Sequence, residues 1–292
     1  MAGARRGRES GRMTRITDVK TVLVTAATGK TGRRVAERLA ARGFAVRAGS
    51  RSGGTLFDWE RPETWGPALE GAELAYAAYY PDLAAPGAVE ALAGFGRLAA
   101  GAGVRRVVLL SGRGEPEAAR VEEALRVAVG SGVELAVVRA AFFVQNFTEG
   151  ALAQGVAAGE FTFPAGSVAE PFVDADDVAD VVVAALTEDG HAGAVHEVSG
   201  PRLVTFAQAA EELGAAAGRD VRYVPVSEER YAAELAGYGL PEPQAAWLAG
   251  LFASLLDGHN ASVTDGVRRV LGREPRDFAD AVKAAFAPGA GA

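Results

Sequence analysis

Residues 21–39 read TVLVTAATGKTGRRVAERL and decide the fold. The apolar run at 22–24 is typical of a strand buried on both faces, and the residues after 32 place apolar side chains at helical spacing. A turn that contains Gly29 and Gly32 joins the two. In a strand–turn–helix of this kind, free N–H groups at the start of the helix bind phosphates. The stretch therefore predicts a dinucleotide-binding fold.

The glycine pattern departs from the usual spacing at one position. Gly29 and Gly32 fall where the backbone passes close to a pyrophosphate and where the helix presses against the strand. The preceding glycine would lie at Ala26 or Ala27, depending on the variant of the motif. Because alanine adds only a methyl group, the turn survives if the residue there keeps a negative φ. The alternative is a βα turn that binds no nucleotide.

Composition argues against several kinds of site and partner. The 292 residues contain no cysteine and three histidines without metal-ligand spacing, so we expect neither disulfides nor a metal site. The net charge of −7 argues against nucleic acid as a partner, because phosphate neutralisation needs a basic face. The mean hydropathy of +0.09 and the lack of a long apolar run predict a soluble, cytoplasmic protein that does not enter a membrane.

The order of strands and helices predicts an α/β fold with a doubly wound parallel sheet, that is, a Rossmann fold, and a smaller C-terminal substrate-binding lobe. Strands are expected at 21–24, 45–50, 72–78, 105–110 and 133–138, each followed by a helix. We expect four parts: a disordered basic extension (1–18), an NAD(P)-binding core (19–150), a mixed α/β remainder with the substrate-covering lobe (151–287) and a tail (288–292).

Helix boundaries are read from caps and periodicity. In the first half a helix is expected at 84–101. In the second half, Asp174 or Asp176 is expected to cap one helix and Thr205 the next. The helices expected there are 176–187, 206–217, 228–237, 241–257 and 275–287.

Two residues after the second strand bear on the choice of cofactor. Arg51 lies about 20 residues beyond the glycine turn, where an acid suits a ribose hydroxyl and an arginine suits a 2′-phosphate. No acid occurs in residues 49–52, so NADP(H) is favoured over NAD(H). Asp58 follows in a loop where an aspartate can meet an adenine amino group. The alternatives are a solvated surface arginine and an aspartate that caps the loop.

Candidates for catalysis follow the third and fourth strands. Ala77 and Ala78 are small enough to admit a ribose, and Tyr79 and Tyr80 come next, at the edge where ligands bind. A hydroxyl at Ser111 can donate to a substrate carbonyl as hydride arrives. Packing explains the tyrosines equally well, and a turn cap explains the serine. No tyrosine has a lysine four residues later, so the tyrosine–lysine acid pair of many reductases is absent.

The segment after the fifth strand offers flat and polar side chains. Phe142 and Phe143 can stack on a nicotinamide or a flat substrate, and Gln145 and Asn146 can anchor polar groups. Arg139, at the end of the strand, is interpreted as a structural arginine.

Together these segments resemble the NmrA-like atypical short-chain dehydrogenase/reductases, which include type 2 NAD(P)H:quinone reductases. The resemblance rests on residues 24–32, 105–111, 138–146, 171–179 and 196–201 with 205–206. It implies that the cofactor is bound by Ala26, Thr28, Gly29, Lys30, Thr31, Gly32, Arg51, Asp58, Ala77, Ala78, Ala141 and Phe142. It implies a substrate side formed by Phe143, Gln145 and Asn146.

The leading hypothesis is an NADPH-dependent reductase that transfers hydride to a quinone or another conjugated, aromatic carbonyl-type substrate, including secondary metabolites. Ser111, Tyr79 or Tyr80 would supply the proton. One alternative is a non-catalytic NADP(H)-sensing regulator. Another is a non-redox tailoring enzyme that performs cyclisation or coupling on the same fold. A homodimer is left open.

Overall fold

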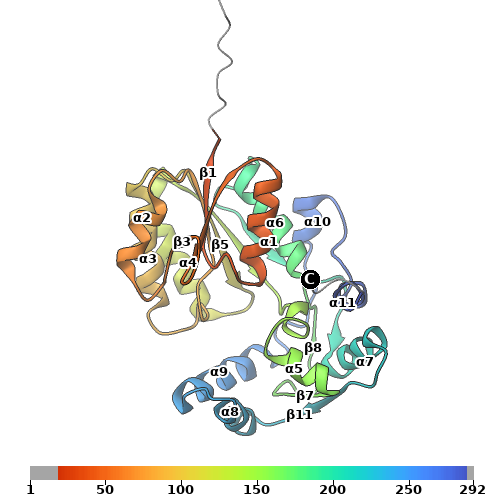
Figure 1. The fold of residues 1–292 in the computed structure, drawn as a ribbon. Helices are drawn as coiled ribbons and strands as arrows, with labels where there is room; N and C mark the ends of the chain where they lie inside the picture. The colour runs from red at the N-terminus through yellow and green to blue at the C-terminus, as the bar shows by residue number, and fades with distance from the viewer. Residues whose placement is uncertain (1–18, 288–292) are drawn as a thin grey trace, which may run out of the picture.

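The computed structural model describes residues 19–287 (Figure 1). The expected extension (1–18) and tail (288–292) lie outside the described residues. Seven strands form a central sheet in the order β3-β2-β1-β4-β5-β6-β9, and all neighbours are parallel. The predicted doubly wound sheet is confirmed. Its strands are β1 (Thr21–Val24), β2 (Ala45–Ser50), β3 (Thr55–Leu56), β4 (Leu74–Ala77), β5 (Arg106–Gly112), β6 (Glu134–Ala140) and β9 (Val195–Val198).

Helices cover both faces of this sheet (Figure 1). Val22 and Val24 of β1 share a buried cluster with Leu39 of the first helix, whereas Leu23 shares one with Phe95 on the other face. The apolar run of β1 is thus buried on both sides, as a parallel strand requires. One face carries α1 (Lys30–Ala41), α6 (Ala175–Thr187) and α10 (Gly266–Leu271), and the other α2 (Trp65–Leu69), α3 (Ala88–Gly101) and α4 (Pro116–Val129).

A third buried cluster forms a lobe, most of which lies below the sheet in Figure 1. The ring of Phe142, just after β6, lies 5.7 Å from that of Phe163 and 6.2 Å from that of Phe252. The lobe therefore packs on the chain as it leaves the sheet. Its elements are α5 (Ala151–Ala158), β7 (Glu160–Phe163), β8 (Ala169–Glu170), β10 (Val204–Thr205), α7 (Phe206–Ala217), β11 (Arg222–Pro225), α8 (Glu228–Gly237), α9 (Glu242–Leu255) and α11 (Phe278–Ala285).

Some boundaries differ from the predicted ones. Helix α3 begins at Ala88 rather than at 84, because Pro86 and Gly87, which has a φ of +87°, precede it. Helix α11 is shorter than 275–287, since Asp277 caps it by accepting from the N–H of Ala279 at 2.9 Å. The short elements α5, α10 and β7 were not predicted, because so few residues give no periodic signal. None of the helices within residues 19–287 is long and apolar enough to cross a membrane.

The predicted helix caps in the second half are confirmed. Asp174 accepts from the N–H of Asp176 at 2.8 Å at the start of α6. Thr205 and Gln208 form a reciprocal capping box at the start of α7.

An ionic cluster ties the C-terminal segment to α6. The side chain of Asp177 is fully buried and lies 2.7 Å from Arg273 and 2.7 Å from Arg276. Its carboxylate also accepts from the backbone N–H of Arg276 at 2.6 Å. Because each carboxylate oxygen has a partner, the charge is stabilised in spite of its burial.

We expect Asp177→Ala to destabilise the protein by about 1–3 kcal/mol, because the two arginines and the backbone N–H of Arg276 lose their buried acceptor. Asp280→Ala is the control: its pair with Lys283, at 4.0 Å, is exposed. That variant should change the free energy of unfolding by less than about 0.5 kcal/mol. Urea unfolding measures both. Equal effects of the two substitutions would contradict a stabilising role for the ionic cluster around Asp177.

Candidate active site

The turn after β1 brings the start of α1 against the backbone of the strand. A Cβ on Gly32 would lie 2.1 Å from the carbonyl oxygen of Ala26 and 3.0 Å from Cα of Ala27, so only glycine fits. The N–H of Gly29 donates to the same Ala26 oxygen at 2.8 Å. No side chain among residues 19–287 caps the N-terminus of α1. The first N–H groups of this helix therefore remain available to an anion at the carboxyl edge of the sheet.

Ala26 does not meet the condition of a negative φ under which an alanine was expected to preserve the turn. Ala26 has a φ of +49°, and among the described non-glycine residues it alone takes a positive value. The left-handed conformation crowds the Cβ of an L-residue. The turn thus has the shape that the usual first glycine gives, but here alanine adopts it.

We expect Ala26→Gly to stabilise the protein by about 0.5–1 kcal/mol, because relief of the left-handed strain exceeds the added entropy of the unfolded chain. Gly32→Ala should instead cost about 1–3 kcal/mol by overpacking the turn. Thermal and urea unfolding of both variants measure these effects. A destabilising Ala26→Gly would show that the strain is absent.

One cavity lies beside the end of β2. It has a volume of about 230 Å³, and we call it the outer cavity. The guanidinium carbon of Arg51 lies 5.2 Å from the ring centroid of Tyr80, whose side chain is largely exposed. Asp58 lines the same cavity, and its carboxylate accepts from the N–H of Glu60 at 3.1 Å. The lining also includes Ala26, Thr28, Gly29, Gly49, Ser50, Phe57 and Trp59.

A second cavity lies where the lobe meets the ends of β5 and β6. It has a volume of about 270 Å³, and we call it the inner cavity. Of the residues predicted for the site, those that line it are Tyr79, Ser111, Ala141, Phe142, Phe143 and Asn146. The structure therefore brings together residues from three strand ends, as the topology of the sheet predicts.

The end of β4 separates the two cavities. Ala77 and Ala78 are both buried, and Ala78 is clamped to Thr25, whose hydroxyl accepts from its N–H at 2.8 Å. The indole N–H of Trp59 donates to the carbonyl of Ala78 at 2.8 Å. Tyr80 then lines the outer cavity, whereas Tyr79 lines the inner one. Only Tyr79 of the two tyrosines is therefore placed beside Ser111 in the inner cavity.

The hydroxyl of Ser111 already has an acceptor. It donates to Oε1 of Glu122 at 2.6 Å, and Glu122 forms an ion pair with Arg139 at 2.7 Å. A serine has one proton to donate, so this proton points to Glu122 rather than to the cavity. Burial, with Glu60 and Glu90 nearby, raises the pKa of Tyr79 and makes it a weaker acid. The interpretation of Arg139 as a structural residue agrees with these contacts.

Gln145 corrects a second expectation. Its amide nitrogen donates to Asp174 at 2.9 Å, and its amide oxygen accepts from the N–H of Ala175 at 2.8 Å. The side chain is buried at the start of α6, so it holds that helix in place instead of anchoring a substrate. The hydroxyl of Thr31 is used in a similar way, since it accepts from Tyr76 at 2.8 Å.

Lys30 lies at the first turn of α1. Burial lowers the pKa of its ammonium group, although Glu149 opposes this shift. Glu149 is taken by Arg33 at 2.6 Å and Arg34 at 2.7 Å. Among residues 19–287, no carboxylate lies within 4.0 Å of the Lys30 ammonium group, which leaves it able to meet a bound anion.

Three carboxyl groups of the inner cavity were not predicted: Asp82, Glu115 and Glu170. Burial and the neighbouring Asp82 together raise the pKa of Glu115 to about 8, and burial is the larger cause. Burial also raises the pKa of Glu170 to about 7. No sequence pattern marks these three residues as a group, because only the tertiary fold brings them together.

The raised pKa of Glu170 predicts a pH-dependent stability. Its ordinary value is 4.5 and its folded value is about 7, so the folded state binds the proton more tightly. Stability from this group is therefore lost as the pH rises through that interval. Glu170→Gln should stabilise the protein by about 1–3 kcal/mol near pH 8 and by much less near pH 5. Denaturant unfolding at the two pH values measures the difference, and an equal effect at both would contradict the prediction.

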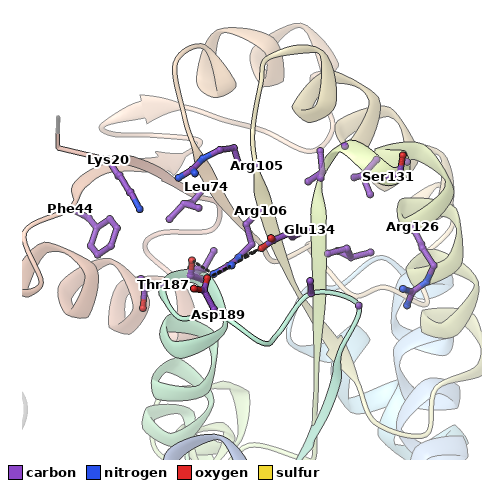
Figure 2. Close-up of a pocket in the computed structure, with 18 residues that line it drawn as sticks. Lys20, Phe44, Leu74, Arg105, Arg106, Arg126, Ser131, Glu134, Thr187 and Asp189 are labelled. Carbon is purple, nitrogen blue, oxygen red and sulfur yellow. Dashed lines mark hydrogen bonds and ion pairs between the residues drawn. The ribbon is translucent and has the colours of Figure 1, made fainter.

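A larger hollow, of about 610 Å³, lies at the opposite edge of the sheet, beside the amino ends of β4, β5 and β6. Figure 2 shows Arg106 in this hollow, close to Glu134 and Asp189. Nε of Arg106 donates to Glu134 at 2.6 Å, so its charge is already neutralised. Ligands of doubly wound sheets bind at the carboxyl ends of the strands, and we therefore assign the site to the outer and inner cavities.

Within residues 19–287, no group of three or more histidine, cysteine, aspartate or glutamate side chains is arranged to hold a metal ion.

Comparison with known proteins agrees with this architecture. The uncharacterized oxidoreductase YesF of Bacillus subtilis is 34% identical over 271 residues, covering 89% of this chain and 93% of YesF. The NAD(P)H azoreductase of Xenophilus azovorans is 33% identical over 256 residues, covering 85% of each chain. The chain belongs to the family of oxidoreductases that these relatives represent.

Solved structures show the same fold. The NADPH-dependent quinone oxidoreductase QOR2 of Escherichia coli, solved with NADPH, superposes with a TM-score of 0.70 at 23% identity. The match covers 91% of this chain and 99% of that one. A comparison with descriptions of known protein families finds no match for this chain.

Proposed function

We propose that the protein is an NADPH-dependent reductase of the NmrA-like type that transfers hydride to a conjugated aromatic acceptor. One observation carries the proposal: the turn of Ala26 and Gly32 lies next to the outer cavity, and the inner cavity follows at the same edge of the sheet. An elongated dinucleotide fits this arrangement, with its phosphates at the start of α1. The named activities of the azoreductase and quinone oxidoreductase relatives support the same reaction class.

The residues of the outer cavity fit the phosphorylated adenosine end of NADPH. Arg51 is exposed beside the cavity and has no ion-pair partner among residues 19–287. A planar guanidinium suits bidentate binding of a 2′-phosphate. Asp58 is placed to accept from an adenine amino group. Lys30 and the free N–H groups of α1 would hold the pyrophosphate, since both lack a counter-charge of their own.

The inner cavity would hold the nicotinamide and the acceptor. Bound NADPH supplies the hydride. Ala141 is small enough to leave room for the nicotinamide beside Phe142, whereas Phe143 and Asn146 lie on the acceptor side of the same cavity. Tyr79 and Ser111 border it as candidates for polar contact with the acceptor. A redox-sensing regulator would keep the outer cavity and cofactor binding but show no turnover, and this is the rival function.

We expect tight NADPH binding that Arg51→Ala weakens by about 1–3 kcal/mol, because a charge-assisted pair with the 2′-phosphate is lost. Binding of NADH, which lacks that phosphate, should change little. Nicotinamide fluorescence in titrations of the wild type and the variant measures both. Arg61→Ala is the matched control, because Arg61 is exposed nearby and pairs with Glu63 at 3.0 Å.

Three results would separate the possibilities. Equal loss of NADPH and NADH binding in Arg51→Ala would contradict the assignment of the 2′-phosphate. Failure of the wild type to bind either cofactor would overturn the proposed function. Tight NADPH binding without oxidation by any of a panel of quinones, azo dyes and iminium compounds would favour the regulator.

A further inference from the structure

The inner cavity has an uncompensated acidic lining. Glu170 is 2% exposed, and its Oε1 accepts no hydrogen bond from any residue within 19–287. Asp82 and Glu115 line the same cavity, and the neighbouring Asp82 contributes to the raised pKa of Glu115. A buried carboxylate oxygen without a donor is costly, so such a group in a cavity indicates a missing partner.

The nearest positive charge does not supply that partner. Arg113 is the one cationic side chain among the described residues that line the cavity. Its guanidinium donates to the carbonyls of Asn260 at 3.0 Å and Ser262 at 2.8 Å, and lies 3.6 Å from Glu197. Arg113 is thus held by other acceptors, and its pull on Glu170 does not offset the burial that raises the pKa of that carboxyl.

Aromatic side chains form part of the remaining lining, beside aliphatic ones such as Leu110 and Leu255. Tyr79, Phe142, Phe143 and Phe252 all line it. The face of an aromatic ring attracts a cation, and the attraction grows when water is excluded. Carboxylates combined with ring faces are the surroundings that suit a flat organic cation, because a neutral ring would leave the carboxylates without a partner.

From this juxtaposition we propose that the inner cavity binds a planar conjugated acceptor that carries a positive charge, such as an iminium ion or an arylmethyl cation. Glu170, Glu115 and Asp82 provide the counter-charge. The inference rests on the proposed function and names its substrate class.

The chemistry of such an acceptor agrees with the polar groups at hand. Hydride from the reduced nicotinamide forms a C–H bond at the electrophilic carbon, while the C=N π pair moves to nitrogen. The iminium becomes a neutral amine and the dinucleotide becomes oxidised, with no proton required. A carbonyl acceptor would need a proton as well. The missing tyrosine–lysine pair and the engaged hydroxyl of Ser111 therefore do not hinder this reaction.

Binding of a cation should also release protons. Glu115 faces Asp82, Glu117 and Glu122, which together with burial raise its pKa to about 8. Glu170 faces Arg113, His259 and Asp257, and its pKa is about 7.

Near neutral pH both groups are therefore partly protonated. A bound cation favours their ionised forms, so protons leave as it binds. A neutral ligand provides no such drive.

The test compares two fluorescent probes of the same ring system, the cation N-methylacridinium and the neutral N-methylacridone. Binding is measured on the protein saturated with NADP⁺, so that no hydride is available and affinity is separated from turnover. We expect the cation to bind at least about tenfold more tightly than the acridone. Glu170→Gln should weaken cation binding by about tenfold and change acridone binding less than about twofold.

Glu123→Gln is the matched control, because Glu123 is exposed on α4 and does not line the cavity. Calorimetry in buffers of different ionisation enthalpy should detect proton release with the cation alone. Equal affinity for the two probes, or a Glu170→Gln variant that weakens both alike, would overturn the inference. The inference would also be overturned if the acridone bound more tightly than the cation and took up protons as it bound. That result would make Glu115 a proton donor to neutral acceptors.

NADPH titration of the same preparations keeps this inference separate from the proposed function. If the protein binds NADPH but does not prefer the cation, only the inferred substrate class is overturned. Loss of NADPH binding would remove the proposed function itself.

Discussion

The structure depends on one close approach, that of α1 to the end of β1. With 2.1 Å between the Ala26 oxygen and the position of a Cβ on Gly32, no larger residue could bring the helix so near. This contact aims the N-terminus of α1 at the carboxyl edge of the sheet. The outer and inner cavities open at that edge, and the opposite edge holds a hollow whose arginine is already paired. The backbone contact of one glycine thus sets where a ligand can bind.

Local signals in the sequence were sufficient for the fold and for part of the lining of the two cavities. The apolar run of β1 and the caps at Asp174 and Thr205 depend on residues close in sequence, and each has its counterpart in the structure. Arg51 lines the outer cavity, and its binding of a 2′-phosphate stays a prediction. Chemistry that depends on tertiary contacts was not predictable. Gln145 is adjacent to cavity residues, yet its amide bonds to α6, and no sequence pattern distinguishes that use from substrate binding.

The same limit explains why the acidic lining of the inner cavity was missed. Asp82 comes from the loop after β4, Glu115 from the start of α4 and Glu170 from a strand of two residues in the lobe. Read singly, each is an ordinary loop, helix or edge residue. Their effect arises only when the lobe closes over the sheet and removes water, which raises the pKa of both glutamates. The fold thereby changes three common residues into an acidic lining of the inner cavity, in which both glutamates have raised pKa values.

A crystal structure of the protein with NADP⁺ would test the central claim most directly, namely that the two cavities form one dinucleotide site. The account predicts the 2′-phosphate against Arg51, the pyrophosphate at the N–H groups that begin α1, and the nicotinamide in the inner cavity near Ala141. A dinucleotide bound in the hollow beside Arg106, or one whose nicotinamide lies outside the inner cavity, would contradict it.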